Sequence, residues 1–331
     1  MRNRTRGTEL AAKVAIAVLT ALLTAGCSKN APVSPTPTSP YVKASDWIGS
    51  VNWAQAVTVL VEMVETSATQ MSFEPDTLTF EAGKPYILKL RSRAGSIEKH
   101  YFAPEGATDF FRTIATRKVQ TSQAEYKAPY FKAVEVNPGK ELDIYFVPVL
   151  PGTYDFLCTI PGHKDYGMKG KVFVTGGAGY QLDLEVDPAF NPALATDPRT
   201  SGSHAVWASR VERSIRLVEL GGGSYGYDPS VLTMKRDSAY VITLLNPVGN
   251  VEKHYYTAAE FFKTLVTRKF EDSDAEIKAP YFRAIELLLP GASGASAKML
   301  VVPTADGTYE VHCTIPGHAP GGMAGALVVG P

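Results

Sequence analysis

The sequence predicts an all-β protein built from two tandem Greek-key β-sandwiches, each with a short helical flap insertion. Three observations predict this class: the second half of the chain repeats the first, short alternating apolar segments recur in both halves, and glycine or proline separates those segments. With 331 residues, of which 45% are hydrophobic and 20% charged, the chain has enough apolar content for two ordinary domains.

The N-terminus predicts a bacterial lipoprotein signal peptide over residues 1–26. Basic residues precede an apolar run at residues 14–23, which is too short for a permanent membrane-spanning helix and is followed by small residues before Cys27. This arrangement resembles a lipoprotein cleavage site, so we expect lipid on Cys27 and an exported protein held on the periplasmic side of a bacterial membrane. An uncleaved anchor helix is the alternative. Residues 27–52, which begin rich in proline, serine and threonine, are expected to form a tether.

A long repeat divides the rest of the chain. It predicts two domains of one fold, at residues 53–176 and 207–331, which match over most of their length apart from short insertions. Residues 177–206 between them are rich in glycine, proline, alanine and aspartate and are expected to form a surface linker.

One segment in each domain favours a helix, because its apolar residues recur at helical spacing with basic residues between them. We expect it to form a flap packed beside the sandwich, with Lys118 towards solvent. Its apolar face is formed by Phe110, Phe111 and Ile114 in the first domain and by Phe261, Phe262 and Leu265 in the second.

The hexapeptide Cys-Thr-Ile-Pro-Gly-His occurs twice, and a methionine follows each copy at the same distance. A histidine within the sequence Glu-Lys-His-Tyr lies upstream at the same place in each repeat. A thiolate, two imidazoles and a thioether form a soft nitrogen and sulfur donor set that suits copper. The predicted ligands are His100, Cys158, His163 and Met168 in the first domain and His254, Cys313, His318 and Met323 in the second.

The spacing explains how one loop can offer three donors. The proline and glycine would turn the chain so that His163 reaches the metal bound by Cys158, and Met168 would approach from one side. Zinc could use the cysteine and the two histidines but has little use for a thioether. Buried packing without a metal and a disulfide between Cys158 and Cys313 are the remaining alternatives, and the repetition of the whole set argues against both.

These motifs resemble those of the cupredoxins, the type 1 blue copper family of azurin, plastocyanin, auracyanin and rusticyanin. The hexapeptide is similar to the azurin, auracyanin and rusticyanin loops, and the spacing from His163 to Met168 is that of rusticyanin and auracyanin. The resemblance covers residues 53–176 and 207–330. It implies a cupredoxin sandwich with one type 1 copper in each domain. The flap after His100 departs from the family pattern and leaves redox tuning and the partner open.

The histidine count argues against an enzyme. Six histidines are present, four are assigned to the two copper sites, and His204 and His312 remain, both expected to face solvent. A multicopper oxidase cluster needs many more histidines. Copper nitrite reductase uses a histidine beside a type 1 cysteine, as His312 lies beside Cys313, but no second histidine closely follows His100 or His254. We therefore expect that the chain is not an enzyme, and a nitrite reductase-like enzyme is the less favoured alternative.

The sequence favours an electron carrier that cycles copper between Cu(I) and Cu(II) at two type 1 sites. Electrons would pass through the exposed edge of His163 or His318 to a redox protein such as a c-type cytochrome or a membrane oxidoreductase. Ile160, Pro161 and Tyr166 would form a docking patch. Periplasmic copper binding, storage or delivery is the alternative. Basic residues are scattered, so nucleic acid is not an expected partner.

Glu98 and Glu252 stand two residues before the first predicted ligand of each domain. A solvated charge pair with the following lysine is the favoured interpretation, and support of the metal site is the alternative.

Overall fold

The computed structural model describes residues 41–106, 109–177 and 180–331. The predicted signal peptide, the predicted lipidation site Cys27 and the first part of the predicted tether lie outside the described residues. Among the described helices, none combines the length and the apolar character needed to cross a membrane.

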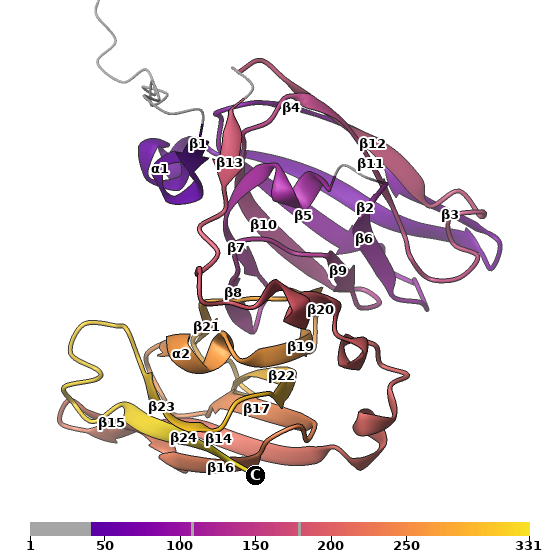
Figure 1. Ribbon diagram of the computed structural model, residues 1–331. Helices are drawn as coiled ribbons and strands as arrows, with labels where there is room; N and C mark the ends of the chain where they lie inside the picture. The colour runs from indigo at the N-terminus through magenta and orange to yellow at the C-terminus, as the bar shows by residue number, and fades with distance from the viewer. Residues whose placement is uncertain (1–40, 107–108, 178–179) are drawn as a thin grey trace, which may run out of the picture. The chain divides into compact units, whose positions relative to one another are not determined.

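The first half forms a β-sandwich of two layers (Figure 1). Its strands are β2 (Val57–Ser67), β3 (Gln70–Glu74), β4 (Thr77–Glu81), β5 (Tyr86–Ser92), β6 (His100–Glu105), β7 (Ile114–Gln120), β8 (Ala124–Lys127), β9 (Ala133–Val136), β10 (Glu141–Pro148), β11 (Gly152–Leu157) and β12 (Lys169–Thr175). One layer has the order β3-β2-β5-β10-β7-β8 and the other has the order β4-β12-β11-β6-β9. Buried and half-buried residues alternate along β5, because successive side chains of a strand point to opposite faces.

The second half repeats the sandwich. Its strands are β14 (Val211–Gly221), β15 (Ser224–Asp228), β16 (Val231–Lys235), β17 (Tyr240–Asn246), β18 (His254–Tyr256), β19 (Leu265–Glu271), β20 (Ala275–Lys278), β21 (Ala284–Leu287), β22 (Ala295–Pro303), β23 (Gly307–His312) and β24 (Ala324–Gly330). One layer has the order β15-β14-β17-β22-β19-β20, and the other combines β16-β24-β23 with β18-β21. The predicted all-β class is confirmed.

The two halves share their sheets. β8 pairs antiparallel with β21, and β9 pairs antiparallel with β20. These pairings produce one eight-stranded and one eleven-stranded sheet, so backbone hydrogen bonds join the halves directly. Only a linker was predicted between the halves, because strands that pair across a large sequence separation leave no local pattern in the sequence.

Aromatic side chains fill the interior of the first half. Phe73 lies edge-to-face with Phe156, at 5.0 Å between ring centroids, and Phe102 stacks on Phe156 at 4.4 Å. Such pairs contribute about 0.5–1.5 kcal/mol each beyond the area they bury. Because β6 begins with His100 and β11 ends just before Cys158, this packing also fixes the ends of the strands that carry predicted ligands.

The predicted flap is shorter than expected. Phe110–Arg112 forms a single 3₁₀ turn, η2, and Ala259–Phe262 forms the one-turn helix α2. Ile114 and Leu265 were predicted on the helical face but begin β7 and β19. Lys118 was predicted to face solvent, yet its side chain is only 13% exposed and forms an ion pair. Pairing with β10 and the β-branched residues of this segment favour a strand.

Part of the predicted tether is folded. Tyr41–Lys43 forms β1 and Ala44–Ser50 forms helix α1, in which Trp47 is buried beside Val147. β1 pairs in parallel with β13 (Gln181–Asp183), which lies in the predicted linker. The stretch rich in proline, serine and threonine ends at residue 40, and the apolar residues beyond it can be buried.

The remainder of the predicted linker carries short turns, named η3 (Pro192–Thr196), η4 (Pro198–Thr200) and η5 (Ala205–Ser209). His204 precedes η5 and is half-buried rather than fully exposed. Its Nδ1 accepts a hydrogen bond from the Val206 N–H at 3.2 Å, which caps the turn.

Candidate metal centres

Each predicted metal loop begins with a tight turn. The His163 N–H donates to the Ile160 carbonyl at 3.1 Å, and Gly162 between them has a φ of +88°. Proline followed by a glycine at positive φ is typical of a type II turn. The second copy repeats the turn from Ile315 to His318 with the same hydrogen-bond length, 3.1 Å.

Backbone hydrogen bonds hold the rest of the first loop. The Cys158 N–H donates to the Met168 carbonyl at 3.0 Å, and the Met168 N–H donates to the His163 carbonyl at 2.9 Å. On β3, Met71 donates its N–H to the loop at 3.1 Å. A Cβ on Gly167, whose φ is +109°, would lie 2.8 Å from the Met71 carbonyl oxygen, so this close approach requires glycine.

Three predicted ligands of the first half converge at the end of the sandwich. His100 Nδ1 lies 3.2 Å from His163 Nδ1, and Cys158 Sγ lies 3.5 Å from His163 Nδ1. The Tyr101 N–H donates to the Cys158 sulfur at 3.3 Å. These residues come from β6 and from the loop after β11, and their side chains are at most 3–4% exposed.

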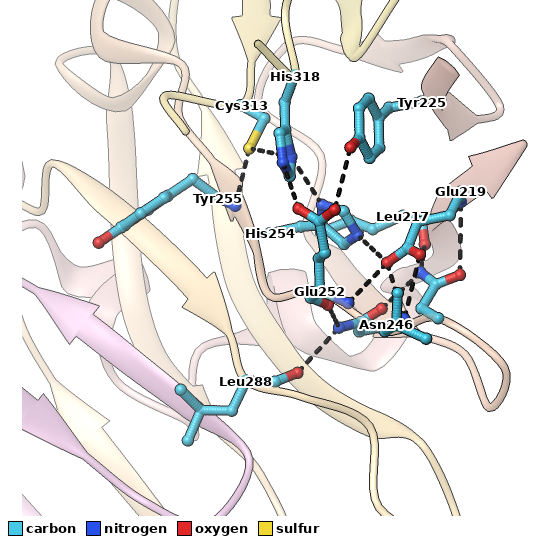
Figure 2. Close-up of polar contacts among 12 residues, drawn as sticks. Leu217, Glu219, Tyr225, Asn246, Glu252, His254, Tyr255, Leu288, Cys313 and His318 are labelled. Atoms are coloured by element: carbon cyan, nitrogen blue, oxygen red, sulfur yellow. Dashed lines mark hydrogen bonds and ion pairs between the residues drawn. The ribbon is translucent and has the colours of Figure 1, made fainter. Parts of the chain in front are cut away.

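Figure 2 shows the same arrangement in the second half, with Cys313 and His318 facing His254. The two Nδ1 atoms lie 3.1 Å apart, and Cys313 Sγ lies 3.5 Å from His318 Nδ1. The Tyr255 N–H donates to the sulfur at 3.3 Å. The three candidate donor atoms of each cluster lie within 4.8 Å of one another.

The predicted methionines lie in the same loops and are fully buried. Met323 accepts the Cys313 N–H at 3.1 Å and donates its own N–H to the His318 carbonyl at 2.9 Å, as Met168 does in the first half. The structure thus brings six of the eight predicted residues into two clusters and holds each methionine beside its cluster through the loop backbone.

Two glutamates accept hydrogen bonds from the outer ring nitrogens of the first cluster. His100 Nε2 lies 2.8 Å from Glu65 Oε1, and His163 Nε2 lies 2.8 Å from Glu98 Oε2. We call these two residues, with their counterparts in the second half, the glutamate caps. Each cap contacts the ring nitrogen that does not face the cluster, so it orients the ring from behind.

Glu65 also orders the segment before His100. Its carboxylate accepts the N–H groups of Ile97 at 3.0 Å and Glu98 at 2.9 Å. Burial raises the pKa of Glu65, but these bonds and the contact with His100 outweigh burial and hold its pKa below the ordinary value. The ionised carboxylate therefore ties the ligand segment to β2.

Glu219 and Glu252 are the caps of the second half, at 3.1 Å from His254 Nε2 and 2.7 Å from His318 Nε2. Glu65 and Glu219 were not among the predicted site residues, although they occupy the same place in the repeat and that coincidence was a usable signal. For Glu98 and Glu252 a solvated charge pair was the favoured interpretation. The structure corrects this: both carboxylates stay about half exposed but bind a histidine.

The caps determine where the ring protons lie. A carboxylate accepts, so each Nε2 carries the proton and each Nδ1 presents a lone pair. Burial lowers the pKa of His100 and of His254, which disfavours an additional proton between the facing Nδ1 atoms. Two lone pairs and a sulfur that converge in a buried space fit a metal ion with nitrogen and sulfur donors.

The spacing of the donor atoms also fits one metal in each cluster. Bonds of roughly 2.0 Å to nitrogen and roughly 2.3 Å to sulfur at tetrahedral angles place two nitrogens roughly 3.3 Å apart and a nitrogen and a sulfur roughly 3.5 Å apart. The clusters have 3.2 and 3.1 Å between nitrogens and 3.5 Å from sulfur to nitrogen. A methionine in the same loop favours copper over zinc.

Burial raises the pKa of both cysteine thiols, although backbone N–H donors partly offset it. The offsetting donors are Ile160 and Tyr101 at Cys158, and Ile315 and Tyr255 at Cys313. Without a metal each thiol therefore keeps its proton at neutral pH. A bound cation has to displace that proton to obtain the thiolate.

The two clusters differ in one aromatic contact. The Tyr225 ring stacks on the His318 ring, with centroids 4.1 Å apart and planes at 10°, and its hydroxyl donates to Glu252 at 3.1 Å. Buried Met71 occupies the corresponding position of the first half, where the tyrosine is in the loop instead, as Tyr166.

The predicted electron exits are covered. His163 and His318 are 3% and 2% exposed, because the glutamate caps lie against their outer nitrogens. This corrects the expectation of an exposed histidine edge. Of the predicted docking residues, Pro161 and Tyr166 are exposed and Ile160 is half-buried.

His312 belongs to neither of the two donor clusters found among the described residues. Its side chain is 37% exposed and lies near Glu310, with 3.5 Å between Nδ1 and the carboxylate, and its backbone N–H donates to the Thr257 carbonyl. It is therefore only partly directed outward.

Comparisons with known proteins agree with the ligand motifs. Residues 60–175 match the model for copper-binding proteins of the plastocyanin/azurin family, which confirms the predicted resemblance. The copper-resistant cuproprotein CopI of Rubrivivax gelatinosus is 31% identical over 117 residues, which cover 35% of this chain and 66% of CopI. The chain thus matches slightly less than two thirds of that relative's length.

Solved structures that the chain matches include copper enzymes. A copper nitrite reductase from Nitrosomonas europaea is 14% identical over 83% of this chain and 94% of its own, with a TM-score of 0.28. A multicopper oxidase from Campylobacter jejuni is 8% identical over 84% of this chain and 64% of its own, with a TM-score of 0.30. The prediction that the chain is not an enzyme rested on the number and the placement of its histidines, and these matches to copper enzymes contradict it. They assign no reaction to this chain.

Proposed function

We propose that each half binds one copper at a type 1 site and exchanges electrons there, because residues 60–175 match the model for copper-binding proteins of the plastocyanin/azurin family and the second half repeats the same ligand motifs. The observation that carries this proposal is the convergence of two Nδ1 lone pairs and a cysteine sulfur in each half, with the outer nitrogens already committed to carboxylates. The proposed ligands are His100, Cys158, His163 and Met168, and His254, Cys313, His318 and Met323.

Bound copper would supply one-electron chemistry between Cu(I) and Cu(II). The residues of the chain would supply a fixed geometry. Glu65 and Glu98 orient the two rings, the Tyr101 N–H faces the Cys158 sulfur, and burial excludes water from the donors. Little rearrangement would then accompany a change of oxidation state, which favours rapid electron exchange.

The surface over His163 supports an exchange route. Glu98 contacts the outer ring nitrogen and is itself 46% exposed, and Pro161 and Tyr166 are exposed nearby in the loop sequence. We place the contact with a redox protein at this face. A carboxylate on it would favour a partner with a basic docking surface, such as a c-type cytochrome or a membrane oxidoreductase.

Copper resistance is a second candidate. The similarity to the copper-resistant cuproprotein CopI favours it, and so does the burial of the donor clusters, which would slow metal release. In this role the two sites would hold copper rather than pass electrons. The two candidates share the same ligands and differ in what the copper does after binding.

We also propose that the protein is exported and held at a membrane by lipid on Cys27. The support is the sequence pattern of residues 1–27 alone. Mass spectrometry of the mature protein, produced in a bacterium that processes lipoproteins, should detect a lipidated cysteine at the N-terminus. An unmodified Cys27 would contradict the proposed lipid anchor.

Spectroelectrochemistry of two single-site variants tests the leading function. In Cys158→Ser and Cys313→Ser proteins loaded with copper, the remaining visible band should bleach on reduction and return on oxidation, within seconds, by exchange with a small redox mediator. Copper that stays bound but cannot be reduced and reoxidised would contradict electron transfer and would favour copper binding for resistance.

A further inference from the structure

A pocket of about 370 Å³ lies next to the strand pair that joins the halves, and is lined from β19, β20 and the segment before β6 together with part of the predicted linker. Its lining is strongly basic. The basic side chains are Lys99, Lys132, Arg268, Lys269 and Lys278, and the one carboxylate among the lining residues is Glu276. The volume falls at the low end of the roughly 300–1,000 Å³ typical of small-molecule sites.

Two of the five basic side chains already have carboxylate partners. Lys99 Nζ lies 2.5 Å from Glu135 and 2.8 Å from Glu276, and Lys269 Nζ lies 2.8 Å from Glu276 and 2.6 Å from Glu271. Glu276 is therefore shared between the two lysines. Five basic side chains thus face three carboxylates, which leaves an excess of positive charge around Lys278, Arg268 and Lys132.

Those three side chains make other contacts. Lys278 lies over the Tyr101 ring at 4.1 Å, Arg268 lies over the Trp207 ring at 5.2 Å, and Lys132 contacts the Ala195 carbonyl. Within the part of the chain that the structure describes, none of the three has a carboxylate at ion-pair distance. Burial lowers the pKa of Lys278. Glu276 and Glu135 act in the opposite direction and raise it, and the nearby Lys269 and Lys99 lower it. An added anion would relieve this unfavourable charge.

The repeat supplies a matched comparison. Lys127 occupies the place of Lys278 in the other half, and there the lysine is paired: its Nζ lies 2.5 Å from Glu125 and 4.0 Å from Glu286. Lys118 also pairs with Glu125. The equivalent lysines of the first half thus form ion pairs. Lys278 in the second half has no carboxylate at ion-pair distance among the described residues.

We propose that this pocket binds a small oxyanion, carrying phosphate or carboxylate groups, between Lys278, Arg268 and Lys132. A charged donor that pairs with an oxyanion forms a stronger hydrogen bond than a neutral one, and the planar Arg268 guanidinium can offer two parallel N–H groups. The pocket lies beside the first donor cluster, since Tyr101 lines it and its N–H faces the Cys158 sulfur. The binding itself does not depend on copper.

Isothermal titration calorimetry of the full mature chain tests the proposal, with inorganic phosphate and succinate as separate probes in low-salt buffer. We expect saturable binding of at least one probe at one site per chain, weakened by added salt. Binding of phosphate alone, or of succinate alone, would identify the group that the pocket prefers.

Lys278→Gln should raise the Kd about tenfold or more, equivalent to about 1.4 kcal/mol, while the matched control Lys127→Gln should leave it unchanged. Lys132→Gln changes an exposed side chain and should weaken binding without a risk to folding. The proposal is overturned if neither probe binds saturably, or if Lys127→Gln weakens binding as much as Lys278→Gln and Lys132→Gln has no effect.

Discussion

The first and second donor clusters are nearly the same in their polar contacts and differ in their aromatic surroundings. The distances between facing ring nitrogens are 3.2 and 3.1 Å, and both sulfurs accept a tyrosine N–H at 3.3 Å. The second cluster adds the stacked Tyr225, where the first has Met71. The groups that hold and orient the donors are therefore the same in both halves. The aromatic packing beside the histidines differs, and this difference could give the two sites different copper affinities or potentials.

The largest expected effect is the loss of one site at a time. Cys158→Ser and Cys313→Ser should each reduce bound copper from about two to about one per chain, because each thiolate serves a single cluster. Metal analysis and the visible thiolate-to-copper band measure this. Loss of both coppers, or retention of both bands, in either variant would show that the two sites are not independent.

Removal of the glutamate cap on β2 or on β14 should have the next largest effect. Glu65→Gln and Glu219→Gln should weaken copper binding in their own half by roughly 10–100-fold, because the cap orients a ring and also accepts backbone N–H groups. Competition with a copper chelator in single-site variants measures the affinity.

Glu105→Gln is the control for these substitutions, because Glu105 is paired with Lys164 on the surface and contacts neither ring. It should leave both affinities unchanged. Equal affinities for Glu65→Gln and Glu105→Gln would show that the caps do not support the metal.

Copper affinity should rise with pH at both sites to a similar extent. Burial raises the folded-state pKa of Cys158 and Cys313, so the metal-free thiols are protonated and copper binding releases a proton. Each unit of decrease in pH below that pKa should therefore weaken binding by up to about tenfold. Chelator competition at pH 6 and pH 8 tests the sign, and an affinity that is independent of pH would refute it.

The smallest effect should be confined to the second site. Tyr225→Phe keeps the ring over His318 but loses the hydroxyl contact with Glu252, and Tyr225→Met reproduces the first half. Aromatic contacts of this kind contribute about 0.5–1.5 kcal/mol, so the affinity or the potential should change only modestly, with the larger change for methionine. Measurement in a Cys158→Ser background isolates the second site, and equal effects of both substitutions would exclude a role for stacking.

The sequence was sufficient for the fold class and for the grouping of His100, Cys158 and His163, because short motifs and a complete second copy carry that information. Glu65 was not predicted, because its contact with His100 joins two separate strands, although the matching Glu219 in the second half was a usable signal. The shared sheets and the charged groups around Lys278 and Lys127 depend on pairing between distant strands. The folded segment at residues 41–50 was missed because its composition was judged together with the proline-rich stretch before it.

Metal content and visible spectroscopy of the mature wild-type protein, through one cycle of reduction and oxidation, show whether both halves bind copper that exchanges electrons. We expect about two coppers per chain and an intense thiolate-to-copper band that bleaches fully on reduction and returns on oxidation. Zinc in both clusters of protein from copper-replete cells, or copper without such a band, would contradict this expectation.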